Sequence, residues 1–350
     1  MSGRGKGAPR ARREGNHEGM RVRWTPGAAR AARRIATAAA LGGGGLTLLG
    51  AVTYGLLIVE ALVARRIVGR PHGMHGPPSD GTYGDYPGGP LRLVMLGDST
   101  SIGLGMARPE ETPGVLLATW LADEARRPVR LHVFGRSGAA SADLPEQVDA
   151  AVKVRPDVVV IFIGSNDVTT QARPAEAVRH LAAAVRRLRR AGAQVVVGTC
   201  PDLGTVRPIA QPLRWVTRRW SRRLAAAQTV AVVAEGGRTV AFADLLGPHF
   251  EKFPGEMFGP DRYHPSARGY LHAAYAVLPS VCAALGLWPE PEPGRGEGSQ
   301  PIHLAAAIAA EESGTEVTAT RVAGRTAGPR GRWARLLRRG GPPLDDTLVR

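Results

Sequence analysis

The chain has 350 residues, of which 43% are hydrophobic, enough for the core of one or two domains. Its formal net charge is +16, but Lys6, Lys153 and Lys252 are its only lysines, so nearly all the positive charge is arginine. Arginine is enriched together with alanine, glycine and proline, which indicates coding bias as much as a polyanionic partner, and no zinc-ligand spacing or aromatic RNA-binding motif accompanies it. The composition therefore predicts no nucleic-acid partner.

The first part of the sequence contains an arm and an apolar stretch. Residues 1–34 are rich in glycine and arginine without an apolar period, which predicts a disordered basic arm. Ile35 to Val59 then run for 25 residues without a formal charge, whereas about 20 suffice for a helix to cross a bilayer. We expect one transmembrane helix as an anchor over residues 35–64. A buried core helix and a cleaved export signal are the alternatives.

Basic residues are denser before this stretch than after it, so the positive-inside rule places residues 1–34 in the cytoplasm and the rest of the chain outside. Export after signal cleavage is the alternative localisation. Residues 65–90 are predicted as a linker, because Pro71–Gly89 contains four prolines and repeated glycines. His72 and His75 lie in this linker without a third ligand nearby, so no metal site is predicted.

Residues 91–288 alternate between apolar runs and helical stretches. Helices are expected between the strands, for example over Pro174–Ala191 and Val216–Ala234. This alternation predicts a parallel sheet covered on both faces, an α/β fold of the three-layer α/β/α sandwich type. The remaining residues, 289–350, form a low-complexity tail that is predicted to be disordered. The predicted strands are Leu91–Leu96, Val129–Phe134, Val158–Ile163, Gln194–Gly198 and Thr239–Phe242.

Polar motifs follow three of these strands. Gly97-Asp98-Ser99 comes directly after the first, at the end where open α/β sheets build their sites, which makes Ser99 a candidate nucleophile. Gly138 lies in a turn after the second strand and Asn166 follows the third, so a backbone N–H and a side-chain amide are available to a developing oxyanion. For each motif alone, a turn or a helix cap is the alternative.

Asp261 precedes His264 by three residues, and this spacing lets the carboxylate orient the imidazole towards a distant serine. Taken alone, Asp261 is also consistent with a loop carboxylate bonded to the backbone. His264, which precedes Pro265, is also consistent with a residue that flanks a helix. The occurrence of all these motifs in order at strand ends favours catalysis.

These motifs resemble the SGNH hydrolases, also called the GDSL esterase/lipase family, over roughly residues 91–287. The resemblance implies the three-layer α/β/α fold, with Ser99 as the nucleophile and Asp261 and His264 as the acid and base. It also implies an oxyanion hole made by Ser99, Gly138 and Asn166, and no metal or organic cofactor.

Two positions depart from the family pattern. Thr100 replaces the leucine of the GDSL motif, and Phe134 stands before Gly135 where many members carry asparagine. The first departure alters a flank of the nucleophile. The second leaves open how the loop that carries Gly138 is held in place.

The resulting hypothesis is a membrane-anchored serine esterase or lipase that hydrolyses a lipid, an acylated glycan or a small ester through an acyl-enzyme. An acyltransferase of the same fold, acting on a glycan or lipid hydroxyl, is the alternative. A non-catalytic surface-binding domain is the second alternative, although binding alone does not require Ser99, Asp261 and His264 together.

Three further features allow two interpretations each. Cys200 and Cys282 either form a disulfide or stay free. Trp215 and Trp220 lie among arginines near the start of a predicted helix and either contact lipid headgroups or pack inward. The apolar side chains in the loop 247–259 form either an acyl site or the packing core of the loop. They are Phe250, Phe253, Met257 and Phe258.

Overall fold

The computed structural model describes residues 55–56, 59–60, 75–287 and 316–317. Within them, one sheet has the strand order β1-β3-β2-β4-β5-β6-β7. Strands β2 to β6 pair in parallel, whereas β1 and β7 pair antiparallel at the two edges. The strands are β1 (Gly81–Tyr83), β2 (Leu91–Gly97), β3 (Val129–Val133), β4 (Val158–Phe162), β5 (Gln194–Gly198), β6 (Arg238–Val240) and β7 (Glu316–Val317).

The central strands are continuous apolar runs because both faces of the sheet are covered. Every residue of β4 is buried, as expected for a parallel strand between two helix layers. In the parallel register, Gly97 at the end of β2 pairs with Phe162, and Phe162 pairs with Gly198 at the end of β5. The carboxyl ends of these strands therefore lie along one edge of the sheet.

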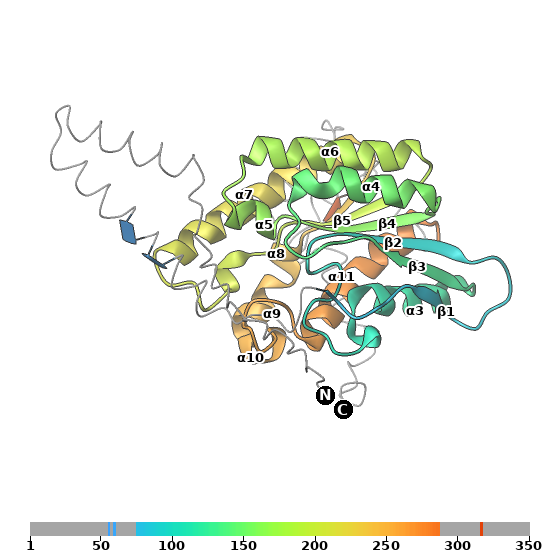
Figure 1. Ribbon diagram of the computed structural model, residues 1–350, viewed down its shortest axis with the longest axis horizontal. Coiled ribbons are helices and arrows are strands. Elements are labelled where there is room, and N and C mark those ends of the chain that lie inside the picture. The colour runs from blue at the N-terminus through green and yellow to red at the C-terminus, as the bar shows by residue number, and fades with distance from the viewer. Residues whose placement is uncertain (1–54, 57–58, 61–74, 288–315, 318–350) are drawn as a thin grey trace, which may run out of the picture. The chain divides into compact units, whose positions relative to one another are not determined.

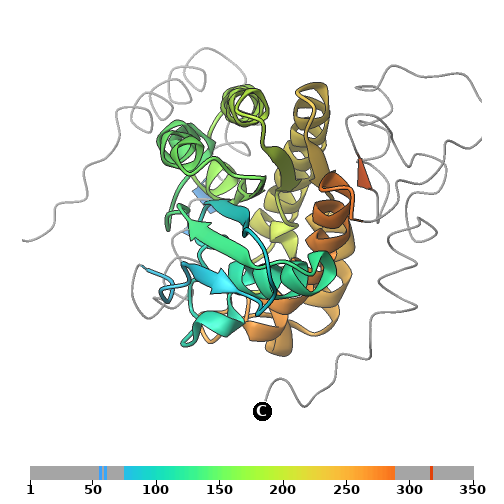
Figure 2. The same ribbon diagram turned by 90° about the vertical axis from the view of Figure 1, so that its right-hand side faces the viewer.

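Helices cover both faces of the sheet (Figures 1 and 2). In Figure 1, α4 and α6 lie above the sheet, and α3 and α11 lie below it. The helices are α3 (Pro113–Ala125), α4 (Leu144–Lys153), α5 (Ser165–Thr169), α6 (Pro174–Arg190), α7 (Leu213–Ala234), α8 (Phe242–Leu245), α9 (Gly247–Lys252), α10 (Pro254–Met257) and α11 (Ala267–Ala284). Short 3-10 turns, which we label η1, η2 and η3, span Pro109–Glu111, Ser141–Asp143 and Leu203–Thr205.

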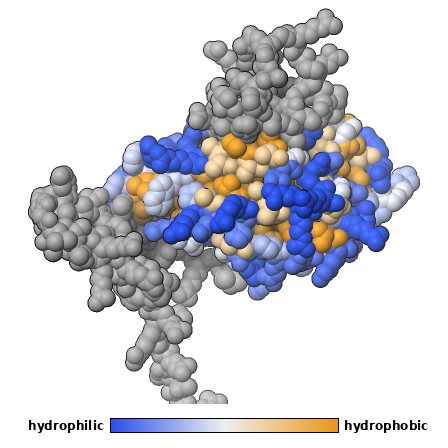
Figure 3. All heavy atoms as spheres, turned by 90° about the horizontal axis from the view of Figure 1, so that it is seen from above, coloured by the Kyte–Doolittle hydropathy of each residue, from blue (hydrophilic) through white to orange (hydrophobic). Residues whose placement is uncertain are grey.

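Helix α6 shows how the sequence sets these layers. Pro174 occupies its first turn, where the missing N–H costs nothing, and Gly192 follows its end with a φ of 92°. Leu181, Val185 and Leu188 recur at helical spacing and are buried, while arginines occupy the other side. Seen from above, strongly hydrophilic side chains accordingly lie around apolar patches (Figure 3).

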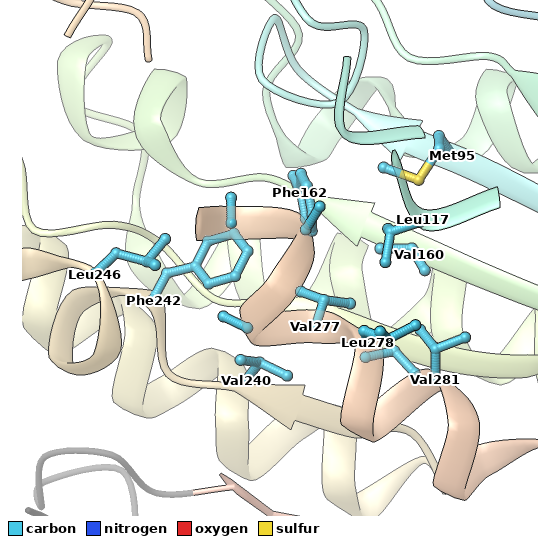
Figure 4. Packing of buried hydrophobic residues seen from close by; sticks show 14 of the residues in the cluster. Met95, Leu117, Val160, Phe162, Val240, Phe242, Leu246, Val277, Leu278 and Val281 are labelled. Atoms are coloured by element: carbon cyan, nitrogen blue, oxygen red, sulfur yellow. The ribbon is translucent and has the colours of Figure 1, made fainter. Parts of the chain in front are cut away.

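Each face of the sheet has its own apolar core. Val159 and Ile161 point to the α4 and α6 side, whereas Val160 and Phe162 point to the α3 and α11 side. The centres of the Phe162 and Phe242 rings lie 4.9 Å apart in an edge-to-face contact. This contact is on the α3 and α11 side, where α11 packs against the sheet (Figure 4). Alternation along β4 therefore divides one apolar run between two cores.

The structure confirms the five predicted strands and the mostly parallel α/β sheet, and it places α6 and α7 where helices are expected. The residues 65–90 predicted as a linker contain β1, which pairs with β3, and Asp80 Oδ1 accepts the N–H of Val133 at 3.0 Å. The folded part thus begins before Leu91. Phe242 begins α8 rather than ending a strand, because β6 stops at Val240.

Several expectations concern residues that the structure does not describe. The arm 1–34, most of the stretch Ile35–Val59, His72 and all but two residues of the tail 289–350 lie outside the described residues. Among the residues that are described, none of the helices is both long enough and apolar enough to cross a membrane.

Both cysteines are buried free thiols, so the disulfide interpretation was wrong. Cys200 lies just after β5 and Cys282 lies in α11. Burial raises the pKa of Cys282 to about 12 and that of Cys200 well above its usual range, so both thiols stay protonated near neutral pH.

Candidate active site

Ser99 lies two residues beyond β2, in a turn that requires glycine. Gly97 has a φ of 125°, and a Cβ there would lie 1.9 Å from the carbonyl oxygen of Phe162. Asp98 N–H donates to that same oxygen at 2.9 Å, and Leu104 N–H donates to the Ser99 carbonyl at 3.0 Å. These bonds hold the backbone on both sides of Ser99.

His264 reaches Ser99 from the loop before α11. Its Nε2 lies 3.0 Å from Ser99 Oγ, and its Nδ1 lies 2.6 Å from Oδ2 of Asp261. The other carboxylate oxygen of Asp261 accepts the backbone N–H groups of Tyr263 and His264, each at 3.0 Å. Arg262, with a φ of 57°, makes the turn between them. The structure thus brings the three predicted side chains into one hydrogen-bonded row.

The charge of Asp261 decides which nitrogen of His264 carries the proton. Burial alone would raise the pKa of Asp261, but the hydrogen bonds from the His264 ring and from the Tyr263 and His264 backbone outweigh burial and lower this pKa. The ionised carboxylate accepts the Nδ1–H. The Nε2 lone pair is then free to accept the Ser99 hydroxyl.

The three predicted oxyanion donors lie at the ends of the adjacent strands β3, β2 and β4. Gly138 is exposed and has a φ of 78°, and Asn166 Nδ2 gives one of its two hydrogens to the Ala139 carbonyl at 2.9 Å. Across the described residues, no acceptor takes the backbone N–H of Ser99 or Gly138. Two backbone donors and the second Asn166 hydrogen are therefore available to a substrate oxygen.

Backbone pairing braces the loop that carries Gly138. Phe134 N–H donates to the Met95 carbonyl and Arg136 N–H donates to the Gly97 carbonyl, both at 3.0 Å. These bonds continue the pairing of β3 with β2 past the end of β3. The brace does not depend on the side chain at position 134, which explains how the loop is held without an asparagine there.

Two buried polar side chains support the site and were missed by sequence reasoning. Gln147 of α4 clamps Gly97, because its Oε1 accepts the Gly97 N–H at 2.7 Å and its Nε2 donates to the Gly97 carbonyl at 3.0 Å. Asp167, next to Asn166, accepts the N–H of Ser141 at 3.1 Å and its hydroxyl at 2.8 Å. A polar residue on the apolar face of an amphipathic helix is the signal that marks Gln147.

A mainly apolar pocket opens beside Ser99, Asn166 and His264. Of the apolar residues in the loop 247–259, Phe250 and Phe258 line it, whereas Phe253 is exposed and Met257 belongs to the core. Within the described parts of the chain, no three His, Cys, Asp or Glu side chains are grouped to hold a metal ion. The apolar lining includes Phe162, Ile163, Pro201, Leu203, Val206, Phe242, Leu246, Phe250, Phe258, Pro265 and Ala273.

Along the chain, the motifs occur in the order Ser, Gly, Asn and Asp-x-x-His. The first three lie beside β2, where the strand order of the sheet reverses. This order and this position are those of an SGNH hydrolase. Residues 95–272 match the GDSL-like Lipase/Acylhydrolase family, and the chain belongs to this family. It is a hydrolase of the esterase and acylhydrolase type.

Known proteins that resemble the chain include the GDSL-like esterase Rv1075c of Mycobacterium tuberculosis, which is 44% identical over 265 residues, covering 72% of this chain and 83% of that protein. Among solved structures, TesA is 26% identical with a TM-score of 0.43, over 55% of this chain and 99% of its own. LAE5, an alpha/beta hydrolase enzyme from the metagenome of Lake Arreo, Spain, is 24% identical with a TM-score of 0.44, over 57% of this chain and 97% of its own.

Proposed function

We propose that the chain is a membrane-anchored serine esterase that cleaves carboxylic esters through an acyl-enzyme. The observation that supports this most directly is the hydrogen-bonded row of Ser99, His264 and Asp261 beside an apolar pocket. Acyl transfer to serine needs a hydroxyl, a base that takes its proton and a carboxylate that orients the base. The row supplies these three groups.

In the first step, His264 Nε2 takes the proton of Ser99 while Oγ forms a bond to the ester carbonyl carbon. The tetrahedral intermediate then collapses, the bond to the alcohol oxygen breaks, and the leaving alkoxide takes the proton from His264. A water molecule that loses its proton to His264 next attacks the acyl carbon. The bond between the acyl carbon and Ser99 Oγ then breaks, the carboxylic acid leaves, and Oγ takes the proton back from His264. Asp261 stays ionised throughout, because its pKa is lowered.

The oxyanion of each tetrahedral intermediate would bind to the backbone N–H groups of Ser99 and Gly138 and to Asn166 Nδ2. The bond from Asn166 to the Ala139 carbonyl fixes the amide plane before substrate arrives, so no reorientation is required. Loss of one such donor costs on the order of 2.7–4 kcal/mol in transition-state stabilisation.

The pocket favours an uncharged, apolar acyl group. Its walls are mostly aromatic and aliphatic. Among the described residues that line it, the carboxylates are Asp98 and Asp202, and Arg218 and Arg222 already pair with Asp202 at 3.3 Å and 3.2 Å. The described lining therefore offers no unpaired charged side chain that would bind a charged acyl chain.

Ser99→Ala should lower the hydrolysis of p-nitrophenyl esters by a factor of about 10⁴ or more while leaving thermal unfolding unchanged. The measurement is initial rates of the full chain on acetyl to long acyl esters. Ser101→Ala is the matched control, because the Ser101 hydroxyl donates only to the Asp98 carbonyl, at 2.7 Å, and turnover should persist. Turnover by a folded Ser99→Ala protein would contradict the assignment, and a preference for charged acyl groups would contradict the apolar pocket.

The anchor and the extracytoplasmic location of residues 91–288 rest on the uncharged stretch Ile35–Val59 and the basic residues before it. We expect the chain to stay with membranes during alkaline carbonate extraction and its enzyme domain to be cut by protease added to intact cells. Release by carbonate argues against the anchor, and protection from protease argues against the location.

A further inference from the structure

The first half of α7 exposes aromatic side chains. Trp215 is 58% exposed and Trp220 is 42% exposed, so the interpretation that they pack inward was wrong. Arg219 and Arg223 are exposed between and beside them, and the Arg219 guanidinium lies 5.8 Å from the centre of the Trp215 ring. We call Trp215, Arg219, Trp220 and Arg223 the α7 face.

The arginines of this half-helix divide into two kinds. Arg218 and Arg222 turn towards the protein, where Asp202 pairs with both and Asp244 pairs with Arg222 at 3.1 Å. Arg219 and Arg223 have no carboxylate partner among the described residues. The α7 face therefore combines indole rings with cations that no carboxylate of the described residues neutralises.

The location of this face agrees with a lipid partner. Glu60 Oε2 accepts the N–H of Leu213, the first residue of α7, at 2.9 Å. Glu60 directly follows the uncharged stretch Ile35–Val59, and Val59 itself is 55% exposed. Ser221 of α7 accepts the N–H of Leu203 at 3.3 Å, and Leu203 lines the pocket. The half-helix that carries the α7 face thus contacts both Glu60, which follows the uncharged stretch, and Leu203 in the wall of the pocket.

We propose that the α7 face binds the surface of a bilayer that contains anionic phospholipids. Indole rings prefer the level of the headgroups, where an apolar ring and a polar N–H are both accommodated, and unpaired guanidinium groups bind lipid phosphates. The proposal rests in part on the proposed anchor, because a stretch that enters the bilayer next to Glu60 holds α7 close to the headgroups. A water-insoluble ester then has a short path from the membrane to the pocket.

The test uses the full chain and phospholipid vesicles whose acyl chains are brominated, since bromine quenches nearby indole fluorescence. Vesicles of phosphatidylcholine alone are compared with vesicles that also contain phosphatidylglycerol. With phosphatidylglycerol present, we expect Trp215→Phe/Trp220→Phe to remove the bromine-dependent part of the quenching that the wild type shows. We expect Arg219→Glu/Arg223→Glu to weaken the quenching, and Lys153→Glu/Arg190→Glu, an equal charge change at exposed positions on α4 and α6, to leave it unchanged.

Hydrolysis of a soluble ester should be the same in all these variants, which verifies that they are folded. Equal quenching in the wild type and Trp215→Phe/Trp220→Phe would overturn the proposal. Quenching that is the same with and without phosphatidylglycerol would also overturn it. So would the finding that Arg219→Glu/Arg223→Glu lowers the oligomeric state of the chain without lipid and leaves the quenching unchanged.

Flotation of the vesicles distinguishes this contact from the anchor. If only the anchor binds the vesicles, every variant floats even at about 1 M salt, where the Debye length is near 3 Å, and no variant changes the quenching. If only the α7 face binds the vesicles, the wild type floats with anionic vesicles at low salt alone, and Arg219→Glu/Arg223→Glu does not float. Absence of flotation under all conditions would overturn both.

Discussion

Asp98 is a buried carboxylate next to Ser99, with 2% of its surface exposed. Burial raises its pKa to about 6, although the Thr100 N–H donates to it at 2.9 Å. Because the folded state holds this proton more tightly than the unfolded state, the stability that the group contributes is complete below about pH 4. It is lost as the pH rises through about 6.

Asp98→Asn keeps an oxygen that accepts the Thr100 N–H but has no proton to lose. The free energy of unfolding of this variant, relative to the wild type, should therefore increase by up to about 3 kcal/mol from pH 4 to pH 7.5. Urea denaturation at both pH values measures the difference. Asp85→Asn, at an exposed position, should show no such trend. A difference for Asp98→Asn that does not vary with pH would contradict the raised pKa.

Three residues of the site could be predicted because each follows an apolar run, whereas Asp261 and His264 were predicted from their spacing. Ser99, Gly138 and Asn166 were placed by the ends of three predicted strands, and the structure brings them to adjacent strand ends. The consequences of burial could not be predicted from residue types. The raised pKa of Asp98 results from its burial, which exists only in the folded protein.

At the scale of elements, two glutamines join helices to strand ends. Gln147 of α4 clamps Gly97 at the end of β2. Gln228 of α7 accepts the N–H of Cys200 at 2.8 Å and donates to the Ile163 carbonyl at 3.1 Å. Both amides satisfy backbone groups where a strand ends and its ladder partners are lost.

Gln147→Leu leaves the buried N–H of Gly97 without its partner, whereas the Gly97 carbonyl keeps the bond from Arg136. We expect a loss of about 1–3 kcal/mol in the free energy of unfolding and a lower kcat, because the turn that carries Ser99 loosens. Urea denaturation and ester kinetics measure the two effects. Lys153→Leu, at an exposed position of the same helix, serves as the control and should change neither. A stable and fully active Gln147→Leu protein would exclude a supporting role for this clamp.

Helix α7 shows why an element can be predicted while its orientation cannot. The buried side of its first half carries Thr217 and Ser221, and Ser221 accepts the backbone N–H of Leu203. A polar side therefore faces the protein and an aromatic side faces outward, the reverse of the ordinary amphipathic pattern. The sequence alone does not show that the Ser221 hydroxyl accepts the N–H of Leu203, because this bond depends on where the turn η3 lies in the folded protein.

For the whole molecule, the sequence pattern predicts the centre of the sheet and misses its edges. Strands β2, β4 and β5 are buried on both faces, so burial selects apolar runs that stand out in the sequence. Strands β1 and β7 have three and two residues, too few for an alternating pattern to be recognised.

The two thiols provide a measure of how cooperatively this unit unfolds. Cys200 and Cys282 are fully buried, and burial raises the pKa of both, so little reactive thiolate exists in the folded state. We expect Ellman's reagent to label both thiols at the rate of global unfolding, so the labelling rate should rise with the urea concentration. Asp85→Cys adds an exposed thiol that should react at once. Immediate labelling of the wild type without urea would show local opening around β5 or α11 instead.

The row of Ser99, His264 and Asp261 spans a long stretch of sequence, since 165 positions separate the serine from the histidine. A ribosome therefore completes β2 and Ser99 well before it reaches His264. Until residues 261–264 have emerged and α11 has docked, Ser99 lacks the imidazole that lies 3.0 Å from its Oγ in the folded protein. If the proposed mechanism holds, the growing chain is inert towards esters until α11 is in place.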